Sequence, residues 1–364
     1  MFFRRSREQK YGRITSDTWK RFRKNPLAIM SLCIIGIFTL IAILGYLITP
    51  DKTPYANEQH LEIAVQKPNF KVQMLKIYDR DKVSQSVFKT MLFGKKADYT
   101  SIPVYRHWVK DGMLYAEVFT GDNPNAGETI CVSGKQYEIV TKRYLLGTDR
   151  YGRDMLSQLI IGTRVSLSVG LIAIAIAILL GVTLGAVASY FGKWADRLIM
   201  WLINVVWSVP TILLVIAITF ALGKGFWQVF VAVGLTMWVD LARMVRGQVM
   251  SIKEKEFVEA GRALGFSNFR IIFRHILPNV VGAASVITAS NFATAILQEA
   301  GLSFLGIGVQ PPMPSWGTMI KENYGYIILD AAYMAIIPGI AIMLLVFAFI
   351  MLGSGLRQSQ SERQ

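Results

Sequence analysis

The feature that most constrains this chain is a series of apolar stretches, each long enough to cross a lipid bilayer. A helix needs about 20 apolar residues to cross the hydrocarbon core. Six stretches meet this requirement, at residues 27–48, 165–186, 198–222, 226–244, 280–297 and 332–352. Only 17% of the 364 residues are charged, against about a quarter in soluble domains. The sequence therefore predicts an all-α polytopic membrane protein with six transmembrane helices.

The first stretch, residues 27–48, has a cleavable signal peptide as its alternative interpretation. The apolar core of a signal peptide is about 7–15 residues long and is followed by a small-x-small cleavage site. This stretch is longer and no such site follows it, so we expect a membrane span.

The basic residues predict the orientation of the chain. The segment 1–26 holds nine Lys and Arg against two acidic residues, and the loop after the fourth span is also net basic. Lys and Arg near span ends favour the cytoplasm, so we expect this segment, that loop and the tail 357–364 to lie inside. The net charge of +15 could suggest nucleic acid, but the cations cluster beside apolar spans and match a membrane surface better.

Residues 49–146, between the first two spans, then lie outside the membrane. Segments such as MLYAEVFTG and KQYEIVTKRYLL alternate apolar and polar residues, and turn-forming GDNPNAGE and SGK separate them. This pattern is typical of short strands. We expect a small, β-rich extracytoplasmic insert domain, with a flexible linker as the alternative.

The usual signatures of covalent chemistry are missing. The two cysteines, Cys33 and Cys131, stand in different environments, so we expect no disulfide. The three histidines, His60, His107 and His275, are too far apart for a metal motif. Neither G-x-x-x-x-G-K-[ST] nor G-x-S-x-G occurs. We expect no catalytic residue, cofactor site or metal site.

A compact charged module follows the fourth span, with the sequence EKEFVEAGRALGFSNFRIIFRHILPN at residues 254–279. Two sets of apolar residues have the i, i+3, i+4, i+7 spacing of one helix face. They are Phe257, Ala260, Gly261 and Leu264, then Phe269, Ile272, Phe273 and Ile276. Gly265 provides a helix stop, Ser267 or Asn268 a cap, and Pro278 a boundary with the next span.

The first of these helices suits a partner's groove. Its small residues let another surface approach the backbone closely, and Phe257 offers one aromatic anchor. The alternative is an amphipathic helix that rests on lipid. The residues we assign to partner contact are Glu256, Phe257, Glu259, Ala260, Gly261, Arg262, Gly265 and Phe266.

Polar or helix-breaking residues inside spans are candidates for a substrate path. Ser208 and Pro210 should kink or break the third span. Asp240 lies late in the fourth span and Glu299 near the outer end of the fifth. The alternatives are an Asp240–Arg243 ion pair and a Glu299 exposed to water. The motif GTDRYGRD at residues 147–154 predicts a tight turn braced by paired charges.

Residues 259–278 resemble a known motif. EAGRALG followed by HILP is similar to the EAA loop of ABC importer permeases: Glu-Ala-Ala, three residues, Gly, nine residues, Ile-x-Leu-Pro. Glu259, Ala260, Gly265, Leu277 and Pro278 match, whereas Gly261 replaces an alanine and His275 an isoleucine. LGTDRYGRDMLSQLIIGTRVSLSVG and LSFLGIGVQPPMPSWGTMI also resemble the peptide/nickel branch of this family, most closely its oligopeptide and dipeptide C-type subunits.

The resemblance covers about residues 27–356, except an insert at roughly 49–143. It implies a type I ABC importer permease fold, with a core at 147–356 and a coupling loop at 246–279 in a bacterial plasma membrane. It also implies two ATPase subunits that bind ATP and Mg²⁺, a homologous second permease and an extracytoplasmic peptide-binding protein. Oligopeptides are the leading substrate, with dipeptides, haem and nickel complexes as alternatives.

A membrane-embedded enzyme and a receptor or scaffold that uses the insert are the other functional classes. Copurification of ATPase subunits and a second multispan chain would distinguish a permease from both. The role of the insert does not follow from the resemblance.

Overall fold

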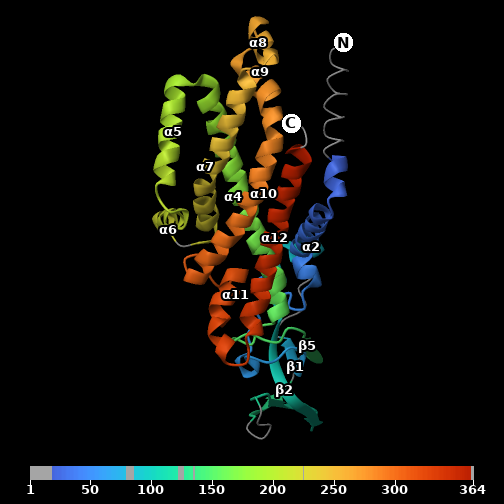
Figure 1. Cartoon of the computed structure of the whole chain (residues 1–364). Helices are drawn as coiled ribbons and strands as arrows, with labels where there is room; N and C mark the ends of the chain where they lie inside the picture. Colours follow the sequence, from blue (N-terminus) through green and yellow to red (C-terminus); the bar gives the residue numbers. More distant parts are fainter. Residues whose placement is uncertain (1–18, 79–85, 122–126, 134–135, 224, 362–364) are drawn as a thin grey trace. The chain divides into compact units, whose positions relative to one another are not determined.

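The computed structural model describes residues 19–78, 86–121, 127–133, 136–223 and 225–361 (Figure 1). Most of the basic N-terminal segment and the last three residues of the predicted tail lie outside this range. The helical elements are α2 (Pro26–Ile48), η1 (Pro54–Ala56), η2 (Leu61–Ile63), α3 (Val87–Phe93), α4 (Met155–Phe191), α5 (Lys193–Trp207), α6 (Thr211–Leu222), α7 (Phe226–Lys253), α8 (Glu256–Ala263), α9 (Asn268–Ile271), the π-helix η4 (Ile272–Ile276), α10 (Leu277–Leu305), α11 (Trp316–Asn323), η5 (Tyr324–Ile328) and α12 (Tyr333–Ser361). The strands are β1 (Phe70–Tyr78), β2 (Tyr99–Lys110), β3 (Met113–Val118), β4 (Thr129–Val132) and β5 (Tyr137–Tyr144).

The described chain divides into two compact units. The first holds the described residues up to Phe38, then Leu167–Leu302 and the described residues from Ile342 onward. The second holds Thr39–Ser166 and Ser303–Ala341. Each unit is described by itself below.

The helices account for the six predicted spans. Among the described residues, five helices are long and apolar enough to cross a membrane: Pro26–Ile48, Met155–Phe191, Phe226–Lys253, Asn268–Leu305 and Tyr333–Gln360. The sixth is a pair, α5 and α6, that bends by 94° at the predicted break. Several helices extend beyond the apolar stretch that identified them. In particular, α12 continues to Ser361 and includes most of the segment expected as a tail.

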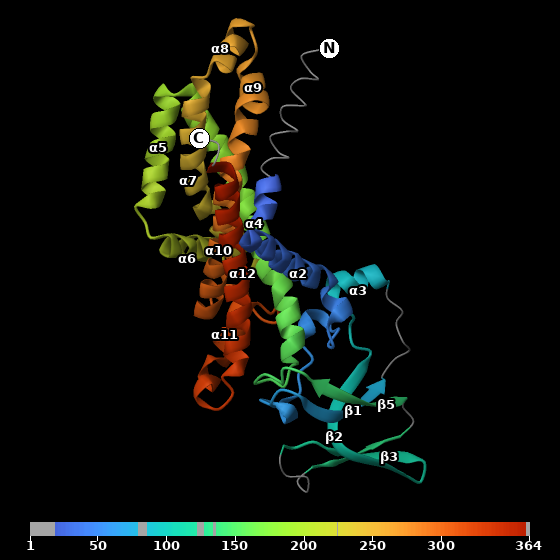
Figure 2. The same cartoon turned by 45° about the vertical axis from the view of Figure 1, so that its right-hand side comes forward.

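Small residues let α4 and α7 pack closely in the first unit. A Cβ added at Gly185 would lie 2.4 Å from the Ala242 carbonyl oxygen, and one at Gly181 would lie 2.9 Å from the Trp238 carbonyl oxygen. In lipid the hydrophobic effect does not drive helices together, so the van der Waals contacts of closely packed backbones stabilise their association instead. In both views α5 runs beside α7 (Figures 1 and 2).

The second unit contains a five-stranded antiparallel sheet with the order β4-β3-β2-β1-β5 (Figure 2). The alternation noted in the sequence determines which side chains enter its core. On β3, Leu114 and Ala116 are buried, and they meet Leu75 of β1 and Val104 of β2. The described residues of the insert thus form a sheet with its own apolar core rather than a linker.

Candidate functional site

The charged module folds as two short helices joined by a glycine corner. Gly265 has φ +74°, a backbone conformation that glycine adopts without a Cβ penalty. The Gly265 amide donates to Arg262 O at 2.9 Å, and the Phe266 amide donates to Gly261 O at 3.0 Å, the pair of bonds that defines a Schellman motif. Ser267 then caps α9 by accepting from the Arg270 amide. The predicted glycine stop and the Ser267 cap are both present.

One side of the module is anchored on the long helices of the same unit (Figures 1 and 2). Val258 of α8 and Ile271 of α9 are buried in one cluster with Val249 and Ile252 of α7. The Tyr190 hydroxyl of α4 donates to Asn268 Oδ1 at 2.7 Å. The module is therefore held firmly to α7 and α4 through side chains on a single face.

The other side of α8 carries an exposed apolar row. Phe257 is 37% exposed, Leu264 is 72% exposed, and Ala260 between them is also exposed. The sequence assigned Gly261 to this row, but Gly261 is buried beside Val258. The reason is that α8 packs against the chain through Gly261 and Val258, so the predicted apolar face is divided between an inner and an outer part.

The second predicted apolar face is wrong in detail. Ile272 and Ile276 are buried, but Phe269 is 70% exposed and Phe273 is 52% exposed. Their rings contact each other at a tilt of 32°, with centroids 4.3 Å apart. The π-helix η4 adds a residue to its turn, so the 3.6-residue spacing that predicted a single face does not hold over Ile272–Ile276.

The remaining residues assigned to partner contact surround the exposed row. Glu256, Glu259, Arg262 and Gly265 are exposed. The Arg262 guanidinium lies over the Tyr190 ring at 5.5 Å. Phe266 is half-buried, and its ring stacks on His275 with centroids 5.8 Å apart. The structure therefore brings an acidic residue, an arginine and exposed apolar side chains onto one end of the unit.

The predicted break of the third span has a defined geometry. Helix α5 ends at Trp207 and α6 begins at Thr211, with Ser208 and Pro210 in the break. The Ser208 hydroxyl donates to the Val205 carbonyl oxygen at 2.7 Å. Both residues are exposed. A proline at this point lacks the amide that would continue the helix, which explains why the axis turns here.

Asp240 of α7 lies against this break. The Trp207 indole N–H donates to Asp240 Oδ1 at 3.2 Å. The Arg243 guanidinium lies over the Trp207 ring at 3.4 Å. No Asp240–Arg243 ion pair is formed among the described residues, because each group contacts a different part of the same indole.

A cavity of about 90 Å³ opens beside Asp240 in the first unit. Its walls come from both sides of the break and from two long helices: Val206, Trp207, Thr211, Leu214, Thr236, Met237, Asp240, Asn291, Thr294 and Gln298. We call it the Asp240 pocket. The structure thus brings the break and Asp240 together. Glu299 does not line this pocket. Its side chain is completely buried, so the alternative of a water-exposed Glu299 is also wrong.

Sequence reasoning missed three polar residues of the pocket. Asn291, Thr294 and Gln298 stand at i, i+3 and i+7 on α10. This is the spacing of one helix face, and three hydrogen-bonding residues on one face of a span would have been a usable signal.

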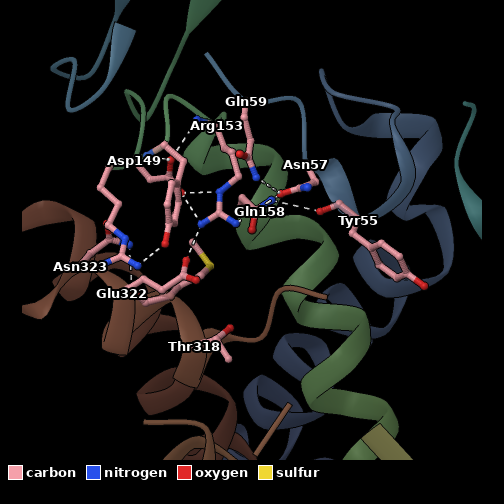
Figure 3. Close-up of polar contacts among 12 residues, drawn as sticks. Tyr55, Asn57, Gln59, Asp149, Arg153, Gln158, Thr318, Glu322 and Asn323 are labelled. Carbon is pink, nitrogen blue, oxygen red and sulfur yellow. Dashed lines mark hydrogen bonds and ion pairs between the residues drawn. The ribbon is translucent and has the colours of Figure 1, made fainter. Parts of the chain in front are cut away.

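The motif GTDRYGRD forms the braced turn that its composition predicted (Figure 3). Asp149 accepts from the backbone amides of Tyr151 and Arg153 at 2.9 Å each. The Arg153 guanidinium pairs with both Asp149 and Glu322. Burial alone would lower the pKa of Arg153, but the two carboxylates raise it. A Cβ at Gly152 would meet the His60 carbonyl oxygen at 1.7 Å, so the turn requires glycine there.

Comparison with known protein families gives two matches. Residues 173–360, just over half of the chain, match the family described as binding-protein-dependent transport system inner membrane component. Residues 14–68 match the N-terminal TM domain of oligopeptide transport permease C. The first match includes the module α8–α9 and the Asp240 pocket. Residues 69–172, which contain the sheet, lie outside both.

Curated relatives carry transport names. The chain is 41% identical over 214 residues to a "Glutathione transport system permease protein" of Pectobacterium atrosepticum, covering 59% of this chain and 71% of the relative. It is 42% identical over 213 residues to a "Dipeptide transport system permease protein" of Alkalihalophilus pseudofirmus, covering 58% and 70%. A glutathione permease protein of Escherichia coli is 36% identical over 260 residues, covering 71% and 80%.

One solved structure to which the chain is similar is that of the MetNI methionine ABC transporter in an inward-facing conformation. It has a TM-score of 0.46 and 18% sequence identity, and the match covers 58% of this chain and 98% of the other.

Proposed function

This chain belongs to the family of binding-protein-dependent transport system inner membrane components, and from that premise we propose that it is the membrane-spanning subunit of an ATP-driven peptide importer. Its curated relatives are permease proteins for glutathione and dipeptides. The substrate we assign is therefore a short peptide.

The observation that carries the proposal is the exposed apolar row Phe257, Ala260 and Leu264 on the anchored module. An apolar helix face that its own chain leaves open suits the groove of a partner. In the proposed importer that partner is an ATPase subunit, and Glu259 and Arg262 make polar contacts at the rim. ATP and Mg²⁺ are bound by the ATPase subunits and not by this chain.

The firm anchoring of the module supports its use as a lever. Because Val258 and Ile271 pack on α7, a displacement of α8 is transmitted to α7 and α10. Those helices carry Asp240 and Asn291, which line the pocket. We infer that ATPase motion reaches the substrate path through these packed helices.

The path itself lies between this chain and a second, homologous permease in our proposal. Two ATPase subunits drive alternating access, and an extracytoplasmic binding protein delivers the peptide. In our proposal the module and the N-terminus lie in the cytoplasm and the insert outside, which the basic residues of these segments support. The whole assembly lies in a bacterial plasma membrane.

The test uses cells that lack their own copy of the gene and carry a variant of it. Ala260→Trp places a large side chain on the exposed row without a clash inside the chain, and Glu259→Lys reverses a rim charge. We expect both variants to insert into the membrane normally, to lose copurifying ATPase subunits and to abolish uptake of labelled peptide. Ala97→Trp, at an exposed alanine of the insert, is the matched control and should transport normally. Normal uptake by both module variants would contradict the proposed function.

A further inference from the structure

The Asp240 pocket has a chemistry that no comparison assigns. Asp240 is the one charged residue of its lining, and it stands among amide, hydroxyl and apolar groups. Its Oδ1 accepts from the neutral Trp207 indole at 3.2 Å. No cation pairs with Asp240 among the described residues, and the nearby Arg243 guanidinium lies over the Trp207 ring. A carboxylate within a membrane span favours a positively charged guest.

The pocket suits an ammonium group better than a metal ion. The described residues contain no group of three or more His, Cys, Asp and Glu side chains that could hold a metal. A divalent cation prefers several oxygen ligands with more than one carboxylate. An ammonium group needs one carboxylate and two further acceptors, and the pocket supplies these as side-chain oxygens.

Two amides of α10 provide acceptors. The Asn291 amide nitrogen donates to the Met237 carbonyl oxygen at 3.3 Å, so the side-chain oxygen of Asn291 is the atom that can accept from a guest. Gln298 Oε1 is buried and accepts no hydrogen bond among the described residues. An acceptor buried without a donor is costly, so Gln298 is suited to a donor that a guest brings.

The spacing of these amides matches an extended peptide. Asn291 and Gln298 are seven residues apart on α10, and at 1.5 Å per residue this is about 10 Å. An extended chain advances about 3.3 Å per residue, so about three peptide residues span the same distance. The cavity of about 90 Å³ holds several waters, or an amino group with the first part of its residue, so the following residues of a peptide would have to extend along α10 beyond it.

We propose that the Asp240 pocket binds the amino terminus of the transported peptide, with the ammonium group on Asp240 and the peptide backbone along Asn291 and Gln298. This inference rests on the proposed function, because it names the group of the peptide that the permease recognises. It adds a specificity element on the permease that is separate from any selection by a delivery protein.

The test measures binding to the transporter purified through this chain and placed in lipid nanodiscs. The probes are Ala-Ala-Ala, N-acetyl-Ala-Ala-Ala and N-acetyl-Ala-Lys-Ala. The native protein should bind Ala-Ala-Ala about ten- to hundredfold more tightly than its N-acetyl form, the range of one hydrogen bond to a charged group. Asp240→Asn keeps an oxygen for the Trp207 indole and should reduce the affinity for Ala-Ala-Ala to that of the acetylated peptide.

Unchanged affinity of Asp240→Asn for N-acetyl-Ala-Ala-Ala shows that the variant is folded. Asp111→Asn, which removes an exposed carboxylate at the β2–β3 turn, is the matched control and should keep the native preference. The inference would be overturned if the native protein bound Ala-Ala-Ala and N-acetyl-Ala-Ala-Ala with equal affinity. It would also be overturned if Asp240→Asn still preferred Ala-Ala-Ala, or if Asp240→Asn lost affinity equally for the two peptides. N-acetyl-Ala-Lys-Ala binding as tightly as Ala-Ala-Ala would overturn the assignment to the amino terminus in favour of side-chain ammonium groups.

Failure of this inference is distinguishable from failure of the proposed function. If cells import Ala-Ala-Ala through this chain but the purified native transporter binds none of the probes, the pocket assignment alone is overturned. Cells whose import of peptides does not depend on this chain overturn the proposed function.

Discussion

The indole N–H of Trp207, the last residue of α5, donates to Asp240 of α7 at 3.2 Å. The same ring lies under the Arg243 guanidinium. The indole therefore contacts two opposite charges that stand one helical turn apart on α7, a spacing at which such charges can pair with each other.

Removing the Trp207 indole should reduce import. In Trp207→Ala we expect Arg243 to reach Asp240 and to neutralise the pocket, which lowers peptide uptake about tenfold, the equivalent of one hydrogen bond to a charged group. Trp207→Phe keeps a ring under Arg243 and should retain most of the uptake. Initial rates of labelled tripeptide uptake measure both, and equal losses in the two variants would contradict this role of the indole.

Substitutions at Gly265 should separate conformational strain from complete loss of the corner. Because Gly265 has φ +74°, Gly265→Ala adds a penalty of about 1–2 kcal/mol and should weaken uptake partially. Proline locks φ near −65° and removes the amide that donates to Arg262 O, so Gly265→Pro should abolish uptake. The amount of each variant in the membrane fraction is the control, and it should equal the native amount.

Arg153 should be essential for the stability of the second unit. Arg153→Met leaves the buried Asp149 carboxylate and the half-buried Glu322 carboxylate without their cation (Figure 3), and removing one partner of a buried pair costs about 3–5 kcal/mol. We expect a clear fall in the thermal unfolding temperature of the purified chain. Adding Asp149→Asn and Glu322→Gln to Arg153→Met should recover part of it; no recovery would argue against charge as the cause.

The ion pair between Glu58 and Lys142, 2.9 Å apart, should make the second unit acid-sensitive. Burial raises the pKa of Glu58, but the nearby His60 ring and the Lys142 ammonium lower it more, to about 2 from an ordinary 4.5. The folded-state pKa is thus the lower one. The pair contributes its full stability above about pH 4.5 and loses it as the pH falls towards about 2, a change on the order of 2–3 kcal/mol.

Glu58→Gln provides the comparison for this pH effect. The difference in unfolding free energy between native and Glu58→Gln proteins should shrink as the pH falls from 5 to about 2. Hydrogen exchange of the β1 and β5 amides reports it. A difference that stays constant over this range would contradict the assignment to Glu58.

Two glycine substitutions should act in opposite directions on the first unit. Gly185→Ala places a Cβ 2.4 Å from the Ala242 carbonyl oxygen and should destabilise the α4–α7 contact by about 1–3 kcal/mol. A Cβ at Gly247 meets nothing within 4 Å, so Gly247→Ala should be neutral or stabilising by up to about 1 kcal/mol. Thermal unfolding in detergent measures both. Similar changes in the two variants would contradict a specific role of close packing at Gly185.

Local patterns predicted the features of this chain that depend on neighbours in sequence. Apolar length located the spans, Pro210 the break, Gly265 the corner and Ser267 the cap. Each depends on a backbone preference within a few residues. The π-helix at Ile272–Ile276 was not predictable, because a spacing rule assumes one helical period and gives no sign of an inserted residue.

The sequence by itself determined that the chain is a multispan membrane protein with a charged helical module, since unsatisfied backbone groups are costly in lipid and an apolar stretch that crosses it must therefore form a helix. Only the tertiary structure decided what each side chain does there. Val258 and Gly261 face inward while Leu264 faces outward, and Asp240 meets Trp207 and not Arg243. These outcomes depend on which other helix packs against each residue. That packing is determined by side-chain contacts and hydrogen bonds between residues far apart in the chain.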